Sequence, residues 1–167
     1  MKNEEKTNVM RILEQKKLPY TPHTYPHTDG EAVDGATVAR LVGADPARLF
    51  KTLVTQGVSG AHYVFVIPVL AELDLKKAAR AAGEKSLSML PLKNLTPLTG
   101  YVRGGCSPVG MKKRFPTYFD SSALTQETLW VSAGKIGFQV ELAPQDLAAL
   151  VGGSFVPLTK EADHDQS

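Results

Sequence analysis

The sequence predicts one α/β domain of the α+β type, in which helices flank a mixed β-sheet. The chain has 167 residues, which is within the range of a single domain and enough to bury a core. Its 43% hydrophobic and 22% charged residues are ordinary for a globular protein. Strand-like segments dominate the middle of the chain and helical segments interrupt them irregularly, which argues against a regular doubly wound sheet.

Helices are predicted where apolar residues recur at helical spacing between recognisable end signals. Residues 7–17 carry one apolar stripe, and Pro19 closes this helix. Further helices are expected over residues 36–43, 74–82 and 144–152, and residues 86–98 are expected to be helical in part.

Strands are predicted where β-branched and aromatic residues cluster between turn signals. The segment 62–69 is almost continuously apolar, so we expect a buried central strand there. A turn rich in Gly and Ser joins it to a strand at 49–55. Other extended segments are expected over residues 20–25, 99–103, 117–120, 129–132 and 137–142.

The charge is weakly positive and unevenly distributed. The chain carries 19 Lys and Arg against 17 Asp and Glu, a net charge of +2. Residues 161–165 hold three acids and no base, which leaves residues 1–160 with 14 acids and a net charge of +5. This bias is compatible with an anionic partner. We expect the domain to span residues 1–158 and the acidic end, residues 159–167, to be a flexible tail.

The sequence lacks the marks of a membrane or secreted protein. No apolar run approaches the roughly 20 residues that span a bilayer, and the polar start has no apolar core of a secretory signal. Cys106 is the single cysteine, so no internal disulfide can form. We therefore expect a cytoplasmic protein.

Lys51 is the first candidate site residue. In an extended segment 50–54 it shares one face with Leu53, and both faces look at least half buried. We expect its ammonium group to open into a cleft. An edge-strand lysine that discourages pairing, or one that extends to solvent, remains the alternative.

The glycine segment, residues 103–110 (RGGCSPVG), is the second candidate. The paired Gly104 and Gly105 let backbone N–H groups approach a ligand closely, so the segment can hold an anion or an acyl oxyanion. Its spacing to Lys112 does not form a Walker loop. A plain turn between strands remains the alternative.

Cys106 lies inside this segment but lacks the neighbours of a nucleophile. A reactive thiolate needs a base or an electropositive site. Arg103 is close in sequence and no histidine is. We therefore expect Cys106 to be a small apolar residue of the loop.

No metal site or cofactor site is expected. His23 and His27 are four residues apart, but Pro22 and Pro26 prevent a helix that would place them on one face. The other two histidines are distant in sequence, so no zinc ligand set forms.

Two basic clusters are candidates for contacts with phosphates. The first, on the helix expected over residues 74–82, is Lys76, Lys77 and Arg80. The second, directly after the glycine segment, is Lys112, Lys113 and Arg114. Such clusters are usually solvated surface, but the second adjoins the suspected site and can neutralise phosphates there.

Five segments in a fixed order carry a resemblance to a known family. They are FKTL (50–53), LDLKKAA (73–79), TGYVRGGCSP (99–108), VSAGK (131–135) and APQDL (143–147). Each is weak alone, but their order and spacing over residues 5–158 are specific. The chain resembles the YbaK/EbsC family of aminoacyl-tRNA deacylases, most closely its Cys-tRNA(Pro) deacylase branch.

The resemblance implies a fold, an activity and a partner. The implied fold is a curved, barrel-like mixed sheet with surrounding helices, similar to the editing domain inserted in bacterial prolyl-tRNA synthetases. The implied activity is removal of cysteine from Cys-tRNA(Pro), with Cys-tRNA(Cys) as a further substrate. Prolyl-tRNA synthetase is the implied transient partner, and no cofactor is implied.

The resemblance also implies roles for individual residues. Lys51, Gly104 and Gly105 are the implied catalytic residues. The implied substrate-binding residues are Tyr25, Thr52, Ser107, Pro108, Ser132 and Gly134. Contacts to the tRNA backbone are expected from Lys76, Lys77, Lys112, Lys113 and Arg114. Since the motifs contain no Ser-His-Asp set and no carboxylate pair, the nucleophile implied by the resemblance is the thiol of the substrate itself.

The chain departs from close relatives where specificity is at stake. Relatives often carry an aliphatic residue at Cys106, Gly at Ala133, Arg at Ile136 and Asp near Gln139. Two other functions therefore stay open. One is a non-catalytic module that binds tRNA or a nucleotide, and the other is a deacylase for another amino acid such as alanine.

Overall fold

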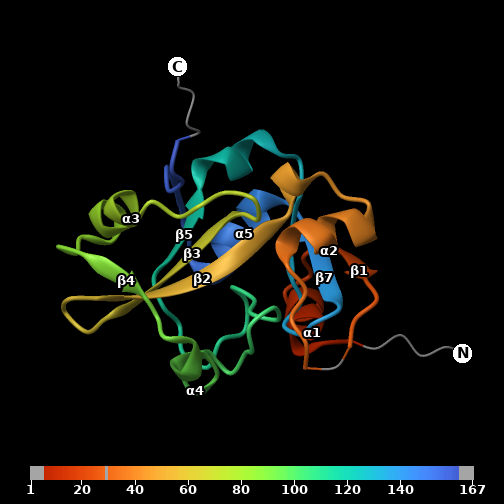
Figure 1. The fold of residues 1–167 in the computed structure, drawn as a ribbon. Helices are drawn as coiled ribbons and strands as arrows, with labels where there is room; N and C mark the ends of the chain where they lie inside the picture. Colours follow the sequence, from red (N-terminus) through yellow and green to blue (C-terminus); the bar gives the residue numbers. More distant parts are fainter. Residues whose placement is uncertain (1–5, 29, 162–167) are drawn as a thin grey trace, which may run out of the picture.

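The computed structural model describes residues 6–28 and 30–161 (Figure 1). Its α-helices are α1 (Asn8–Gln15), α2 (Gly35–Val42), α3 (Leu75–Ala82), α4 (Leu95–Thr99) and α5 (Pro144–Val151). Short 3₁₀ helices lie at η1 (Pro46–Arg48), η2 (Leu92–Asn94) and η3 (Ser121–Thr125). The strands are β1 (Thr21–Thr24), β2 (Phe50–Gly57), β3 (His62–Pro68), β4 (Leu87–Met89), β5 (Thr117–Asp120), β6 (Leu129–Ser132), β7 (Phe138–Leu142) and β8 (Ser154–Val156).

Side chains at the helix ends explain where the helices begin and stop. Thr7 begins α1 by accepting a hydrogen bond from the Met10 N–H at 3.3 Å. Asp74 begins α3 in the same way, and Gly83 ends it with a left-handed φ of 73°. These signals confirm the predicted helices at 7–17, 36–43, 74–82 and 144–152, with ends displaced by one or two residues.

The strands form two sheets. The larger has the order β4-β2-β3-β5-β8, with β2 and β3 paired antiparallel from Phe50↔Pro68 to Gln56↔His62. The pairs β3-β5 and β5-β8 are parallel, so this sheet is mixed, and β3 is its buried central strand as predicted. The smaller sheet has the order β1-β7-β6 and is antiparallel.

The predicted mixed sheet with flanking helices is confirmed, but the curved sheet does not close into a barrel. Within the described residues, the two sheets are joined by an isolated parallel bridge between Leu49 and Trp130. Apolar side chains from both sheets, among them Phe50 of β2 and Leu129 of β6, pack into one core. The division leaves one edge of β2 without a continuous strand partner.

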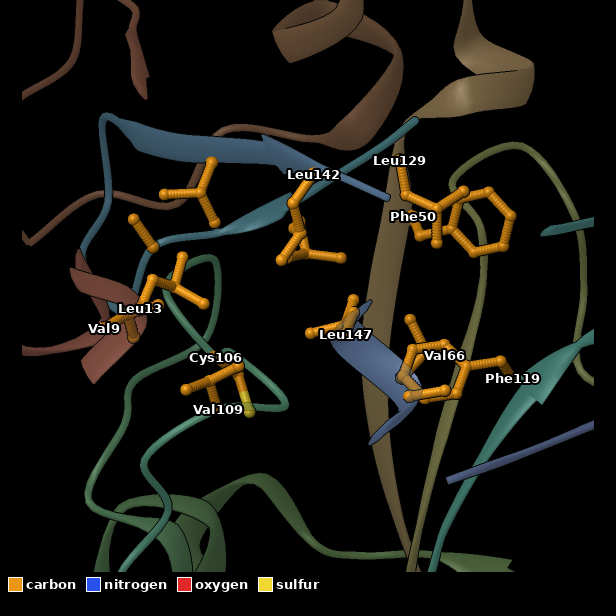
Figure 2. Close-up of a cluster of buried hydrophobic side chains, with 14 of the residues drawn as sticks. Val9, Leu13, Phe50, Val66, Cys106, Val109, Phe119, Leu129, Leu142 and Leu147 are labelled. Atoms are coloured by element: carbon orange, nitrogen blue, oxygen red, sulfur yellow. The ribbon is translucent and has the colours of Figure 1, made fainter. Parts of the chain in front are cut away.

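The main core lies between the two sheets and under α1 and α5 (Figure 2). Val9 and Leu13 of α1 and Leu147 of α5 are fully buried in it. The glycine segment contributes Cys106 and Val109, whose side chains point into the same cluster in Figure 2. Burying the apolar surface of these two side chains, at roughly 25 cal/mol per Å², therefore holds one side of the glycine segment against the core.

The structure corrects one strand prediction and adds two strands. Residues 99–103 are not a strand, because Gly100 ends α4 with a φ of 88° and the Tyr101 N–H donates to Thr99 Oγ1. Residues 86–98 are helical in part, as predicted, but they begin with β4. β8 was not expected; it is three residues long and pairs only with β5.

The end of the described chain packs against α3. The Lys77 Nζ donates to the Thr159 carbonyl at 2.8 Å, and the Lys160 N–H donates to the Glu72 carbonyl at 2.9 Å. Residues 162–167 of the predicted tail lie outside the described residues.

Candidate active site

A cleft of about 950 Å³ opens along the edge of β2. β4 pairs with β2 only from Thr55 onward, so the Phe50–Val54 half of the strand has an open edge. At this edge the Val54 carbonyl accepts a hydrogen bond from the Leu90 N–H at 3.0 Å. Because backbone groups alternate between the two edges of a strand, the N–H and carbonyl of Thr52 also point to this edge. The walls come from the start of α2, the segment 89–95, the glycine segment and the polar face of the smaller sheet.

Lys51 lies on β2 at this cleft and is half buried. Partial burial lowers the pKa of its ammonium group below the ordinary value, and the negative charge of Glu72 opposes this shift without cancelling it. The prediction that the Lys51 ammonium opens into a cleft is consistent with this position. A desolvated cation is a strong partner for a phosphate or a developing oxyanion.

Three residues that line the cleft each carry a buried polar side-chain atom with no hydrogen-bond partner among the described residues. These atoms are Tyr25 Oη, Thr52 Oγ1 and Gln139 Oε1. Tyr25 follows β1 and is 4% exposed, and Gln139 on β7 is 6% exposed. Leaving such a group unsatisfied costs about 1–3 kcal/mol. Their convergence on one cleft therefore marks it as a site for a polar ligand.

Ser132 completes the polar wall on the smaller sheet. It pairs with Gln139 across β6 and β7, so both side chains leave the sheet on the same face. Its Oγ accepts a hydrogen bond from the Gly134 N–H at 3.1 Å. Gly134 does not line the cleft; a Cβ there would lie 3.0 Å from Tyr101 and 3.1 Å from Val9. Gly134 therefore acts on the site indirectly, by holding the Ser132 hydroxyl in place.

Gly104 and Gly105 differ in what they contact. Gly104 lines the cleft with a φ of 86°, and a Cβ there would lie 2.9 Å from the Cβ of Ala32. Gly105 is buried behind the wall, where a Cβ would lie 3.1 Å from the backbone nitrogen of Ile136. The Gly105 N–H donates to the Val102 carbonyl at 2.9 Å. Gly105 thus fixes the shape of the loop, and Gly104 faces the cleft.

Cys106 lines the cleft but its thiol is not activated. Its side chain lies among the apolar residues of the core (Figure 2), and it is 9% exposed. Burial raises the pKa of the thiol to about 12. At neutral pH the group is a protonated thiol, which is a poor nucleophile.

The structure places the other predicted residues of the glycine segment outside the cleft. Ser107 is fully buried, and its Oγ accepts from the Val109 N–H at 3.2 Å. Pro108 lines a second hollow of about 610 Å³ between α1 and α5. This hollow shares no lining residue with the cleft.

The basic residues predicted to contact tRNA are spread over two surfaces. None of the five lines the cleft. Lys113 and Arg114 line the second hollow, and the Arg114 guanidinium donates to the Leu150 carbonyl at 3.3 Å. Lys112 Nζ donates to the Pro97 carbonyl at 3.2 Å. Lys76 and Lys77 lie on α3.

Several cleft residues were not predicted from the sequence. Arg103 adds a second cation, and Asp34 is the one acid in the lining. The Asp34 carboxylate accepts from the Thr37 N–H at 2.8 Å and the Thr37 hydroxyl at 3.0 Å, so it serves as the cap of α2. Local sequence gave a cue for Asp34, since it precedes a helix, but none for its position at the cleft.

Within residues 6–28 and 30–161 no group of three or more His, Cys, Asp or Glu side chains is placed to hold a metal ion. In the same part of the chain, every helix is too short or too polar to cross a membrane.

Comparison with known proteins gives relatives over nearly the whole chain. EbsC of Enterococcus faecalis, a proposed Cys-tRNA(Pro)/Cys-tRNA(Cys) deacylase, is 47% identical over 158 residues, which cover 95% of this chain and 96% of EbsC. A solved structure of a proposed trans-editing enzyme for prolyl-tRNA synthetase aligns with a TM-score of 0.78 at 27% identity, covering 95% and 100% of the two chains. A solved hypothetical protein at 21% identity shares the fold, with a TM-score of 0.80 over 91% and 99% of the chains.

The pattern of one family of known domains matches residues 30–150, which include every residue of the cleft except Tyr25. The resemblance drawn from the five sequence segments is thereby confirmed. The chain belongs to the aminoacyl-tRNA editing domain family.

Proposed function

We propose that this protein is a trans-editing deacylase that removes cysteine from Cys-tRNA(Pro), with Cys-tRNA(Cys) as a second substrate. The family is one of aminoacyl-tRNA editing domains, and the 47% identical relative EbsC carries both substrates in its name. Cysteine and proline are similar in size, and a difference of one methylene in a pocket is worth only about 1–3 kcal/mol, so a second hydrolytic step restores fidelity.

One observation supports substrate-assisted chemistry: the cleft offers polar contacts but no base and no activated nucleophile. The lining contains no histidine, and its one carboxylate, Asp34, is engaged with Thr37. The Cys106 thiol, with a pKa of about 12, is protonated. The reaction then needs a nucleophile from the substrate, and the cysteinyl thiol lies two bonds from its own α-carbon.

In the proposed reaction the substrate sulfur attacks its own ester carbonyl carbon. An S–C bond forms, the carbon–oxygen bond to the ribose breaks, and the ribose oxygen leaves with the thiol proton. The product is a four-membered thiolactone of cysteine, which water opens to free cysteine. Intramolecular attack of well-oriented groups can lower a barrier by about 7–11 kcal/mol.

The side chains of the cleft have distinct proposed roles. Lys51 balances the terminal phosphate or the oxyanion, and the backbone at Gly104 holds the ester carbonyl. Tyr25, Thr52 and Gln139 supply hydrogen bonds to the ribose and the aminoacyl group. Gly105, Ser107, Pro108 and Gly134 act indirectly, because they shape the loop and the hairpin that carry these groups. Prolyl-tRNA synthetase is the proposed transient partner that delivers the tRNA.

A substrate panel tests this function. We expect purified protein to hydrolyse Cys-tRNA(Pro) and Cys-tRNA(Cys) and to leave Ala-tRNA(Pro) and Ser-tRNA(Pro) intact, since alanine has no nucleophile and serine has a poorer one. Lys51→Met, which keeps a chain of similar length without the charge, is the inactive control. Equal turnover of the alanine ester contradicts the thiol mechanism, and turnover of none of the four supports a binding module.

A further inference from the structure

Three large aliphatic side chains are exposed at the mouth of the cleft. Leu70 is 66% exposed, Met89 44% and Leu92 58%, and all three line the cleft. They come from three separate segments: the loop after β3, strand β4 and helix η2. A single exposed leucine is ordinary, but the gathering of three around one cleft marks an interaction surface. We call these three residues the apolar rim.

The size of the cleft leaves room for a ligand that is larger than the aminoacyl group. Its volume of about 950 Å³ is near the upper end of the range of roughly 300–1,000 Å³ for sites that hold drug-sized ligands. The buried, unpartnered polar atoms of Tyr25, Thr52 and Gln139 define a polar interior. The apolar rim is exposed to solvent, so a ligand that fills the cleft is polar at its inner end and presents apolar surface farther out.

The charges of the cleft indicate that this ligand is an anion. Lys51 and Arg103 are the cations of the lining. Asp34, the one acid, is bonded to Thr37. An acidic or phosphate-bearing ligand is therefore favoured over a neutral apolar one.

We infer that the apolar rim binds the unpaired bases at the 3′ end of the substrate tRNA, which extends recognition beyond the aminoacylated ribose; this inference rests on the proposed function. Unpaired nucleotides combine phosphates, which suit Lys51 and Arg103, with flat base faces whose apolar surface can be buried against the aliphatic rim. Contacts to base faces tolerate any base, so the rim supplies affinity for the 3′ end and leaves amino-acid choice to the interior. A protein partner explains the exposed leucines but not the cations beside them.

The test compares rim variants with equally exposed controls. Met89→Ser combined with Leu92→Ser removes most of the rim. Val58→Ser combined with Leu124→Ser removes two apolar side chains that are 69% and 50% exposed and do not line the cleft. Both pairs lie on the surface, so both variants are expected to fold, which a thermal melt verifies. On Cys-tRNA(Pro) we expect the rim variant to raise KM by on the order of tenfold with little change in kcat, and the control variant to change neither.

A tRNA that keeps the riboses and phosphates of its 3′-terminal CCA but lacks the bases there identifies the contact. With this abasic substrate we expect wild type and rim variant to have the same KM. An unchanged KM of the rim variant on intact Cys-tRNA(Pro) overturns the inference. An equal rise on intact and abasic substrates also overturns it, because the rim then contacts something other than the base.

Binding of the free trinucleotide CCA separates this inference from the proposed function. We expect the rim variant, but not the control variant, to lose affinity for CCA in an NMR titration. If wild type cleaves no ester but the rim variant still binds CCA more weakly, the deacylase proposal fails and the rim inference holds. If all three proteins bind CCA equally, the rim inference fails whatever the activity. A rim variant that loses affinity only for prolyl-tRNA synthetase also overturns it.

Discussion

Lys51 combines a positive charge with a half-buried position on β2. Because desolvation lowers the pKa of this ammonium group below 10.5, the charge disappears at a lower pH than that of an exposed lysine. If the Lys51 charge serves the reaction, it contributes fully to the deacylation rate at a pH below the lowered pKa. This contribution to the rate declines as the pH rises through that pKa.

This titration predicts a difference between wild type and Lys51→Arg. A guanidinium keeps its charge up to about pH 12, so the ratio of the wild-type rate to the variant rate should fall with rising pH, with a midpoint below 10.5. The substrate thiol titrates in both reactions and cancels from the ratio. The measurement is initial deacylation rates from pH 6 to 10, corrected at each pH for uncatalysed ester hydrolysis. A ratio that stays constant over this range contradicts a role for a lysine charge that titrates within it.

Cys106 shows how burial decides between two functions of one residue type. The sequence favoured a small apolar residue over a nucleophile, because no histidine is near Cys106, and its position in the core (Figure 2) raises the pKa of its thiol to about 12. We therefore expect Cys106→Ala to keep at least half of the deacylase activity, with a stability loss of about 1 kcal/mol for the small apolar group removed. We also expect iodoacetamide to leave the native thiol unmodified at pH 8, as read by mass spectrometry. Loss of all activity in a folded Cys106→Ala protein would make the thiol catalytic.

At the scale of elements, the glycine segment is held in shape by close contacts on both sides. Gly104 has a φ of 86° and lies against Ala32, and Gly105 lies against the backbone of the hairpin between β6 and β7. The segment thereby links the loop before α2 with the hairpin, across the cleft.

Gly104→Ala and Gly60→Ala form a matched pair that tests this link. Both glycines have a left-handed φ, 86° and 93°, so alanine costs about 1–2 kcal/mol at either position. A Cβ at Gly60 meets nothing within 4 Å, whereas at Gly104 it lies 2.9 Å from Ala32. We expect similar losses of stability in both variants, or a larger one for Gly104→Ala, but a fall in kcat/KM of tenfold or more only for Gly104→Ala. Equal kcat/KM in the two variants shows that the loop position does not matter for the reaction.

Elements with local signals could be predicted, and elements defined by distant partners could not. Helix α3 has its cap Asp74 and its terminator Gly83 within its own sequence, so its bounds were nearly correct. Strand β8 has three residues and is defined by pairing with β5, more than 30 residues earlier. The extended look of residues 99–103 was misleading, because the Thr99 side chain and Gly100 turn the chain there.

At the scale of the whole molecule, the cleft lies where the first half of β2 has no β4 partner, beside the smaller sheet. The sequence indicated Lys51 and Gly104, whose residue types are unusual for their local contexts. It gave no sign of the apolar rim, because Leu70, Met89 and Leu92 are ordinary residues until the fold gathers them. The two sheets meet at the bridge of Leu49 to Trp130, a pairing of residues far apart in the sequence that no local pattern encodes.

The arrangement of basic residues around the molecule leads to a prediction about salt. Binding of a polyanion weakens with salt in proportion to the number of phosphates contacted, with a slope of about 0.7–0.9 in log K per contact. Lys113 is exposed and follows the glycine segment, which forms part of the cleft wall. The Lys77 ammonium, in contrast, donates a hydrogen bond to the Thr159 carbonyl at 2.8 Å. Lys113→Gln should therefore reduce the salt slope of KM for Cys-tRNA(Pro) by about one contact. Lys77→Gln should leave it unchanged, and cysteinyl-adenosine, which has no phosphate, should show almost no slope with any variant. Initial rates between 50 and 300 mM KCl give these slopes. The same slope for all three proteins on tRNA places the phosphate contacts on another surface.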